Sequence, residues 1–137
     1  MKSIGLIACS GKKLSRAAPA ADLYVSPLFK MSRKWVEERC GSWFILSAKW
    51  GLLAPTKIIG PYNETLGKML KVDRELWAAR TKADIIRQLP AELIVLAGEL
   101  YLTALDGLEY EAPLKGLSIG KRLQKLSMEI GRRSSFF

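Results

Sequence analysis

Two groups of polar residues follow stretches that are typical of buried strands. Ser10, Gly11 and Lys12 come after the apolar run 3–9, and Ser47 and Lys49 stand at the end of the run 43–48. Hydroxyls, ammonium groups and glycine amides are the groups that hold anionic ligands in proteins. Ligands of open parallel sheets bind beyond the carboxyl ends of the strands. We therefore expect these five residues to line one binding site.

Asp22 is the candidate for acid–base chemistry, with Lys49 as a second proton carrier. Asp22 is the only carboxylate before Glu37 and stands in a strongly basic part of the chain. It could activate a water molecule or stabilise positive charge that develops on a sugar; the alternative is that it holds Lys12 or Arg16 in place. A lysine acts as a base near neutral pH only when burial or a neighbouring cation lowers its pKa.

The segment 51–65 is the third source of candidate ligand-binding residues. Loops of this length are uncommon in small domains unless they bind something. Tyr62 offers a face on which a nucleobase can stack, as does Tyr24 earlier in the chain, although half-buried packing is an equal interpretation of Tyr24. Asn63 can present its amide to a base edge, and Thr65 adds a hydroxyl. These residues together predict a pocket for a base or a nucleotide.

The chain has no histidine and two cysteines, and this excludes several kinds of site. Serine–histidine and cysteine–histidine nucleophile pairs are absent, as are most zinc sites. Cys9 and Cys40 are expected to be reduced structural residues. No phosphate-binding loop or dinucleotide fingerprint is present, and the acids are scattered. We therefore expect neither a bound metal nor a cofactor.

The net charge of +9 and the isoelectric point near 9.8 indicate a polyanionic partner, with nucleic acid first. The last expected helix carries Lys121, Arg122 and Lys125, which are candidates to contact a phosphate backbone. The alternative is that these three side chains form a solvated helix face.

Strands and helices alternate along the chain and predict an α/β fold. We expect a three-layer domain with a small, mainly parallel sheet and helices on both faces. Ser26, Asp73 and Ser118 are the expected N-caps of the first, second and last expected helices. Strands are expected at 3–9, 43–48 and 92–97, and helices at 27–39, 73–89, 99–105 and 119–132.

The length of 137 residues fits one domain, spanning 1–137. The apolar runs are too short to cross a membrane, and the N-terminus lacks a secretory pattern. We expect a cytoplasmic protein. Apolar helix faces leave a homodimer open.

Several short motifs together resemble a bacterial and phage domain family of unknown function. Some of them, Gly-Leu-Leu-x-Pro and Pro-Tyr, are also similar to a segment of the peroxide-stress YaaA proteins, a family associated with DNA binding. A more distant similarity is to domains of archaeosine-type base-modifying enzymes and to the uracil-DNA-glycosylase-like group. The motifs are Cys9-Ser-Gly-Lys-Lys13, Asp22-Leu-Tyr-x-Ser-x-Leu-Phe29, Ser47-Ala-Lys-x-Gly-Leu-Leu-x-Pro55, Ile59-x-Pro-Tyr-x-x-Thr-Leu66 and Tyr110-x-x-Pro-Leu-x-Gly-Leu-x-Ile-Gly120.

Charge, candidate residues and resemblance favour a domain that recognises nucleic acid or a nucleotide. It could act on a nucleobase or its N-glycosidic bond, in DNA modification or repair. Two alternatives stay open: a DNA-binding module without catalysis, and a regulatory or phage-associated protein that binds a small nucleotide.

Overall fold

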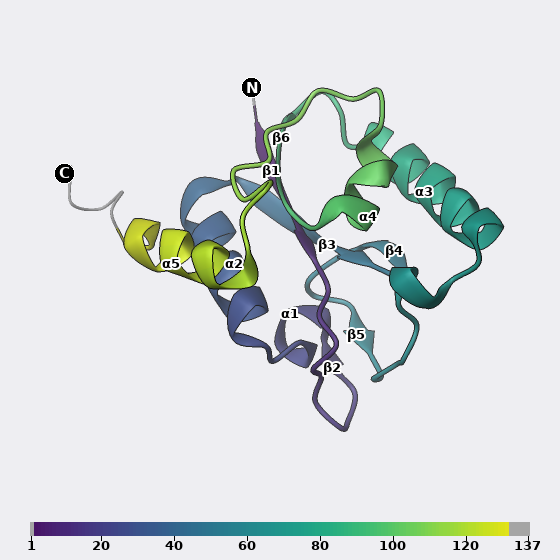
Figure 1. The fold of residues 1–137 in the computed structure, drawn as a ribbon, viewed down its shortest axis with the longest axis horizontal. Coiled ribbons are helices and arrows are strands. Elements are labelled where there is room, and N and C mark those ends of the chain that lie inside the picture. Colours follow the sequence, from purple (N-terminus) through teal and green to yellow (C-terminus); the bar gives the residue numbers. More distant parts are fainter. Residues whose placement is uncertain (1, 132–137) are drawn as a thin grey trace.

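The computed structural model describes residues 2–131 and shows a four-stranded sheet with helices on both faces (Figure 1). The strand order is β4–β3–β1–β6. The strands β1 (Ser3–Ala8), β3 (Ser42–Ser47) and β6 (Glu92–Leu96) are parallel, and β4 (Gly51–Leu53) runs antiparallel to β3 at one edge. This arrangement confirms the α/β fold class and the mainly parallel sheet.

Each face of the sheet has its own hydrophobic core. Helices α2 (Pro27–Arg39) and α5 (Ile119–Glu129) cover one face, and α3 (Lys71–Ile86) and α4 (Glu99–Leu102) cover the other (Figure 1). Trp35 of α2 belongs to the first core and Trp77 of α3 to the second, and each is only 7% exposed. Both tryptophans therefore occupy core-facing positions of their helices.

Two of the three expected N-caps are present. The Ser26 hydroxyl accepts a hydrogen bond from the Phe29 amide at 3.2 Å, and Ser118 accepts one from the Lys121 amide at 3.3 Å. Helix α2 has the expected bounds, with Pro27 at its first position. The last helix was expected to reach residue 132, which lies outside the described residues, but it already ends at Glu129, with Ile130 in an extended conformation.

The expectation that Asp73 caps α3 is wrong. The helix begins two residues earlier, at Lys71, and its N-cap Leu70 makes no side-chain capping bond. Asp73 instead lies in the first turn, where its negative charge is favourable beside the helix dipole. The helix also ends earlier than expected, at Ile86 rather than residue 89. None of the helices in the described part of the chain is long and apolar enough to cross a membrane.

The segments 10–25 and 51–65 are more ordered than their sequences indicate. They contain the short helix α1 (Ala20–Leu23) and a second, two-stranded antiparallel sheet of β2 (Ala18–Pro19) and β5 (Ile58–Ile59). The segments are also joined by backbone hydrogen bonds from the Ala20 and Ala21 amides to the Lys57 and Pro55 carbonyls. They therefore form one unit beyond the carboxyl ends of β1 and β3 (Figure 1). Short 3₁₀ helices lie at Leu66–Lys68 (η1) and Thr103–Leu105 (η2).

Helix α2 packs on β1 at Gly5, and this contact predicts a specific instability. A Cβ atom at Gly5 would lie 2.7 Å from Val36 Cγ1 and 2.8 Å from Val36 Cβ, closer than real contacts. We expect Gly5→Ala to lower the free energy of unfolding by about 1–3 kcal/mol through overpacking. Urea denaturation measures this change. Gly11→Ala is the matched control, because a Cβ there meets nothing within 4 Å; equal effects of the two variants would contradict the packing argument.

Candidate functional site

Three hydroxyl groups form a buried chain beyond the carboxyl end of β3. The Tyr62 hydroxyl lies 2.7 Å from Ser47 Oγ and 2.6 Å from the Tyr24 hydroxyl. Exposure is 0% for Ser47, 1% for Tyr24 and 7% for Tyr62. The structure thus brings together three of the residues that the sequence nominated for ligand binding. We call Ser47, Tyr62 and Tyr24 the hydroxyl chain.

Helix α3 and the β3–β4 turn both hold Ser47 in place. Its carbonyl accepts a hydrogen bond from Trp77 Nε1 of α3 at 2.8 Å, and its Oγ accepts one from the Trp50 amide at 3.0 Å. The turn after Ser47 closes through Gly51, whose φ of +68° suits a residue without a side chain. Ser47 therefore ties β3, the β3–β4 turn and α3 to the hydroxyl chain.

Burial keeps the phenols of the hydroxyl chain protonated. It raises the pKa of Tyr24 to about 12, against the lowering effect of the hydrogen bond from Tyr62. Burial also raises the pKa of Tyr62, and negative charge on the nearby Cys9 sulfur would raise it further. Near neutral pH these groups donate and accept hydrogen bonds and do not act as bases.

The hydroxyl chain holds one more proton than its internal bonds use. Three hydroxyls carry three protons, and the two bonds among them consume two. The Trp50 amide donates to Ser47 and so consumes none. One O–H of the chain is left to donate to a further acceptor.

Cys9 and Tyr101 extend the polar cluster toward β6. The Cys9 sulfur lies 3.2 Å from the Tyr101 hydroxyl, and the Tyr101 ring packs edge-on against Trp77 with centroids 5.7 Å apart. Burial raises the pKa of Tyr101, and the Cys9 sulfur acts in the same direction. Sequence reasoning treated Cys9 as a core residue and did not single out Tyr101. The sequence signal that could have identified Tyr101 was its position just after the end of the third expected strand.

Three lysines lie against two aromatic rings, the buried ring of Tyr62 in the hydroxyl chain and the exposed ring of Trp50. Lys13 Nζ lies 4.4 Å from the centroid of the Tyr62 ring, and Lys49 Nζ lies 6.0 Å from it. Lys49 Nζ is also 5.2 Å from the centroid of the Trp50 ring, and Lys57 Nζ is 4.6 Å from it. We call these five residues the lysine–aromatic row. Within this distance an ammonium group is attracted to the face of an aromatic ring.

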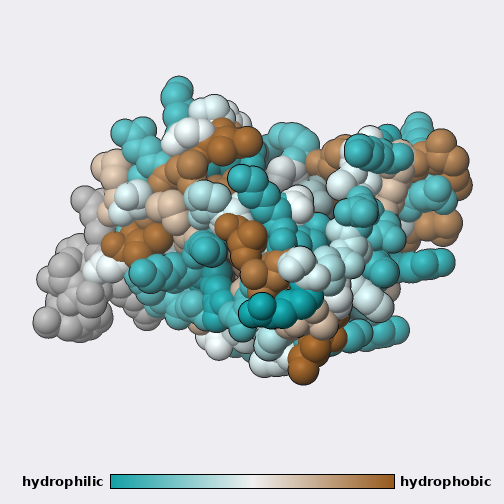
Figure 2. Space-filling view, turned by 90° about the horizontal axis from the view of Figure 1, so that it is seen from below, coloured by the Kyte–Doolittle hydropathy of each residue, from teal (hydrophilic) through white to brown (hydrophobic). Residues whose placement is uncertain are grey.

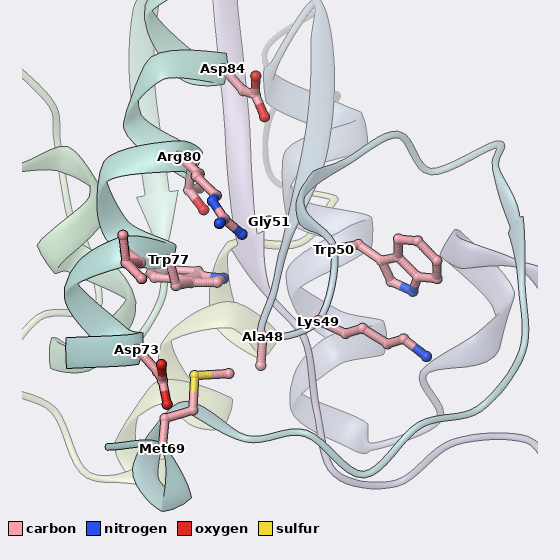
Figure 3. Close-up of a pocket in the computed structure, with 11 residues that line it drawn as sticks. Ala48, Lys49, Trp50, Gly51, Met69, Asp73, Trp77, Arg80 and Asp84 are labelled. Atoms are coloured by element: carbon pink, nitrogen blue, oxygen red, sulfur yellow. The ribbon is translucent and has the colours of Figure 1, made fainter. Parts of the chain in front are cut away.

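Trp50 is the accessible aromatic side chain of this row. It is 42% exposed, whereas Tyr62 and Tyr24 are buried, so neither tyrosine has an open face for stacking. Figure 3 shows Lys49 and Trp50 extending from the β3–β4 turn away from α3. Figure 2 views the molecule from the end where β2 and β5 lie, and hydrophilic side chains cover most of this face, with small hydrophobic patches between them.

Two cavities lie beside the cluster. One, of about 430 Å³, lies between α3 and the β3–β4 turn (Figure 3); we call it the α3 groove. Asp73, Trp77 and Arg80 form its helical wall, and Gly51 lies on the opposite side. The second, of about 70 Å³, lies between the carboxyl ends of β1 and β6 and is lined in part by Ser10, Ser26, Ser32 and Arg122. Its size suits a small group such as a phosphate and excludes a nucleobase.

Asp22, the expected catalytic acid, is bound by an arginine. Its Oδ1 lies 2.8 Å from Arg33 Nη1, and its side chain is 57% exposed. Arg33 also contacts Glu37 at 3.3 Å. Asp22 therefore pairs with Arg33 in the structure. The sequence analysis had named Lys12 or Arg16 as the cations that Asp22 could hold in place. No contact joins Asp22 to the hydroxyl chain among the interactions of the described residues.

The other nominated residues lie at the surface or near it. Lys12, Gly11 and Asn63 are exposed, and Thr65 is half-buried just before η1. Ser10 is half-buried and donates a hydrogen bond to the Lys12 carbonyl at 3.2 Å. Lys13 and Lys57, which the sequence analysis did not nominate, reach the aromatic rings instead.

Two of the three nominated bases on α5 are tied to the backbone. Arg122 Nε donates to the Leu117 carbonyl and Lys125 Nζ to the Pro113 carbonyl, each at 2.9 Å. Both side chains are half-buried, whereas Lys121 is exposed. Arg122 and Lys125 thus hold the segment before α5 onto the helix. Residues 2–131 contain no group of three or more cysteine, aspartate or glutamate side chains that could hold a metal ion.

The shared hydroxyl of Tyr62 predicts a stability effect. Tyr62→Phe leaves both Ser47 and Tyr24 without their common partner in a buried site. We expect the free energy of unfolding to fall by about 1–3 kcal/mol, measured by urea denaturation. Tyr110→Phe is the control, since the half-buried Tyr110 makes no side-chain hydrogen bond among the described residues. An unchanged stability of Tyr62→Phe would show that the chain contributes nothing.

The raised pKa of Tyr24 predicts that stability falls in alkali. The unfolded tyrosine loses its proton near its ordinary pKa of 10.0, but the folded one does so only near 12. The stability from this group is therefore complete below pH 10 and is lost as the pH rises through this window. Each such group contributes a slope of about 1.4 kcal/mol per pH unit. Urea unfolding from about pH 8 to about pH 11.5 should show a shallower fall for Tyr24→Phe than for the wild type; identical slopes would contradict the burial argument.

Comparisons with known proteins place the chain in a family. Residues 4–128 match the model of the family described as "Family of unknown function (DUF6884)". The chain is also similar to the "Uncharacterized protein YfjM" of Bacillus subtilis (strain 168), with 29% identity over 119 residues that cover 77% of this chain and 76% of that protein. No solved structure matches. With nearly its whole length matched, the chain belongs to this DUF6884 family of unknown function.

Proposed function

We propose that the lysine–aromatic row recognises nucleotides, presented by single-stranded nucleic acid or as free nucleotides. The observation that carries this proposal is the exposed Trp50 ring with a lysine ammonium group from Lys49 and from Lys57 within 5.2 Å of its centroid. Proteins that bind unpaired strands combine aromatic stacking faces with positive groups that follow the phosphates.

Binding would exchange one set of contacts for another. A base that stacks on Trp50 displaces a lysine ammonium group from the ring face. The freed lysine has a flexible stem and can pair with the phosphate of the same nucleotide or of its neighbour. Lys13, at the other end of the row, supplies charge for a second phosphate. The row therefore offers one stacking face, the Trp50 ring, with lysine charges beside it for the phosphates that flank the stacked base.

Net charge and motifs add support to the proposal. The charge of +9 favours association with polyanions. The Gly51-Leu-Leu-x-Pro55 motif, which resembles a segment of the peroxide-stress YaaA proteins, a family associated with DNA binding, directly follows Trp50. A duplex hides its base faces in the stack, so the row suits an unpaired or extruded base better than an intact helix.

The proposal is one of binding. A reaction on the base or its glycosidic bond is a further step, in which Asp22 would have to act with its Oδ1 bound to Arg33 and only its second carboxylate oxygen open to water. The unused proton of the hydroxyl chain is the other group that such a reaction could draw on. Chromatography of the bound oligonucleotides for released base tests this step separately.

Fluorescence anisotropy with a labelled oligothymidine strand tests the binding proposal. We expect Trp50→Ala to weaken binding by about 1–3 kcal/mol for each stacked base. We expect Lys57→Ala to reduce the slope of log K against log salt by about 0.7. Lys121→Ala, an exposed lysine on α5, is the matched control and should leave both quantities unchanged.

Two outcomes would contradict the proposal. The first is binding of the single strand that is as tight in Trp50→Ala as in the wild type. The second is preferential binding of a duplex of the same length, lost in Lys121→Ala but kept in Trp50→Ala; this result would favour a DNA-binding module that uses α5.

A further inference from the structure

Helix α3 has a second apolar face, turned away from the sheet. Its inner face buries Trp77, Thr81 and Ile85. The outer face carries Val72, Leu76 and Ile86, which are 59%, 49% and 46% exposed, and between them Ala79 and Ala83, which are also exposed. We call these five outer residues the α3 seam. In Figure 2, hydrophobic side chains gather at the right-hand end of the molecule, where α3 lies in Figure 1.

The spacing of the α3 seam is that of a helix–helix interface. Successive seam residues are separated by four, three, four and three positions. This is the heptad pattern that keeps one face of a helix against a partner helix. The seam extends along about 21 Å of the helix axis, at 1.5 Å per residue. The small side chains of its middle allow two helix backbones to approach closely, and the larger ones at its ends fill the wider gaps.

Charges beside the seam favour an antiparallel partner of identical sequence. Glu75 flanks the first half and Lys82 the second half, whereas Asp73 lines the α3 groove and Arg87 is paired with Asp84 at 2.8 Å. When a second copy packs antiparallel, Glu75 faces Lys82 of that copy, and the two-fold axis repeats this pair. Arg80, which would otherwise face its own copy at the centre, turns toward Gly51 and the α3 groove (Figure 3).

From these observations we propose that two copies of this chain associate through antiparallel α3 helices. One pair of 16-residue helices buries an area at the low end of specific interfaces, which are about 1,200 Å² or more in total. We therefore expect a weak dimer with a dissociation constant of about 10–100 µM. This inference is independent of the proposed function, because its residues lie outside the lysine–aromatic row.

Sedimentation velocity over a range of concentrations tests the dimer. The wild type should pass from monomer to dimer, and Leu76→Glu should remain monomeric at concentrations where the wild type is mostly dimeric. Ile119→Glu is the matched control, since Ile119 is 65% exposed on another helix, α5. A wild type that stays monomeric up to about 1 mM overturns the proposal, and so does equal weakening of the dimer by the two glutamate variants.

Charge reversal and cross-linking test the antiparallel arrangement. Glu75→Lys and Lys82→Glu should each weaken the dimer about tenfold, and the double variant should restore it. Ala79→Cys should form an intermolecular disulfide, because the two-fold axis passes near this position. Ile86→Cys should not, because it faces Val72 of the second copy. A disulfide through residue 86, or a double variant weaker than both single ones, overturns the antiparallel arrangement.

Discussion

The organisation of this molecule depends on the three hydrogen bonds made by Ser47. Its carbonyl is held by Trp77, and its hydroxyl is held by the Trp50 amide and the Tyr62 hydroxyl. Ser47 is fully buried, so each of these groups would be left without water if its partner moved. One residue thus fixes helix α3, the turn that carries Lys49 and Trp50, and the loop that carries Tyr62.

The hydrogen bonds of Ser47 explain how the buried hydroxyl chain positions the lysine–aromatic row. Trp50 and Lys49 are exposed, but their backbone is fixed by the Ser47 hydroxyl beneath them. The Tyr62 ring is positioned by the two hydroxyl contacts of its phenol, and it presents its face to Lys13 and Lys49. The exposed side chains thus extend from a turn and a ring whose positions are set by buried hydrogen bonds.

Much of the fold could be predicted from the sequence, because the strands and the helix starts depend on residues that are close together in the chain. Apolar runs give the three parallel strands, and Ser26 with Pro27 gives the start of α2. The small sheet of β2 and β5 could not be predicted, because each strand has two residues and forms only when segments forty residues apart meet.

The candidate site was predictable in part, for a similar reason. Ser47, Tyr24 and Tyr62 were identified as polar groups near strand ends, but their burial and their mutual hydrogen bonds are tertiary properties. Stacking was expected on two tyrosines that proved to be covered, while the exposed ring is Trp50. The pairing of Asp22 with Arg33 joins residues eleven positions apart across the start of α2, which no spacing rule indicates.

The lysines set the charge of the candidate site, because the chain offers no histidine and the buried phenols stay neutral. The chain has no histidine, and burial keeps the phenols protonated beyond neutral pH. The positive charge of the lysine–aromatic row comes from the ammonium groups of its three lysines. This combination of cations with protonated phenols suits the proposed recognition of a phosphate better than proton transfer.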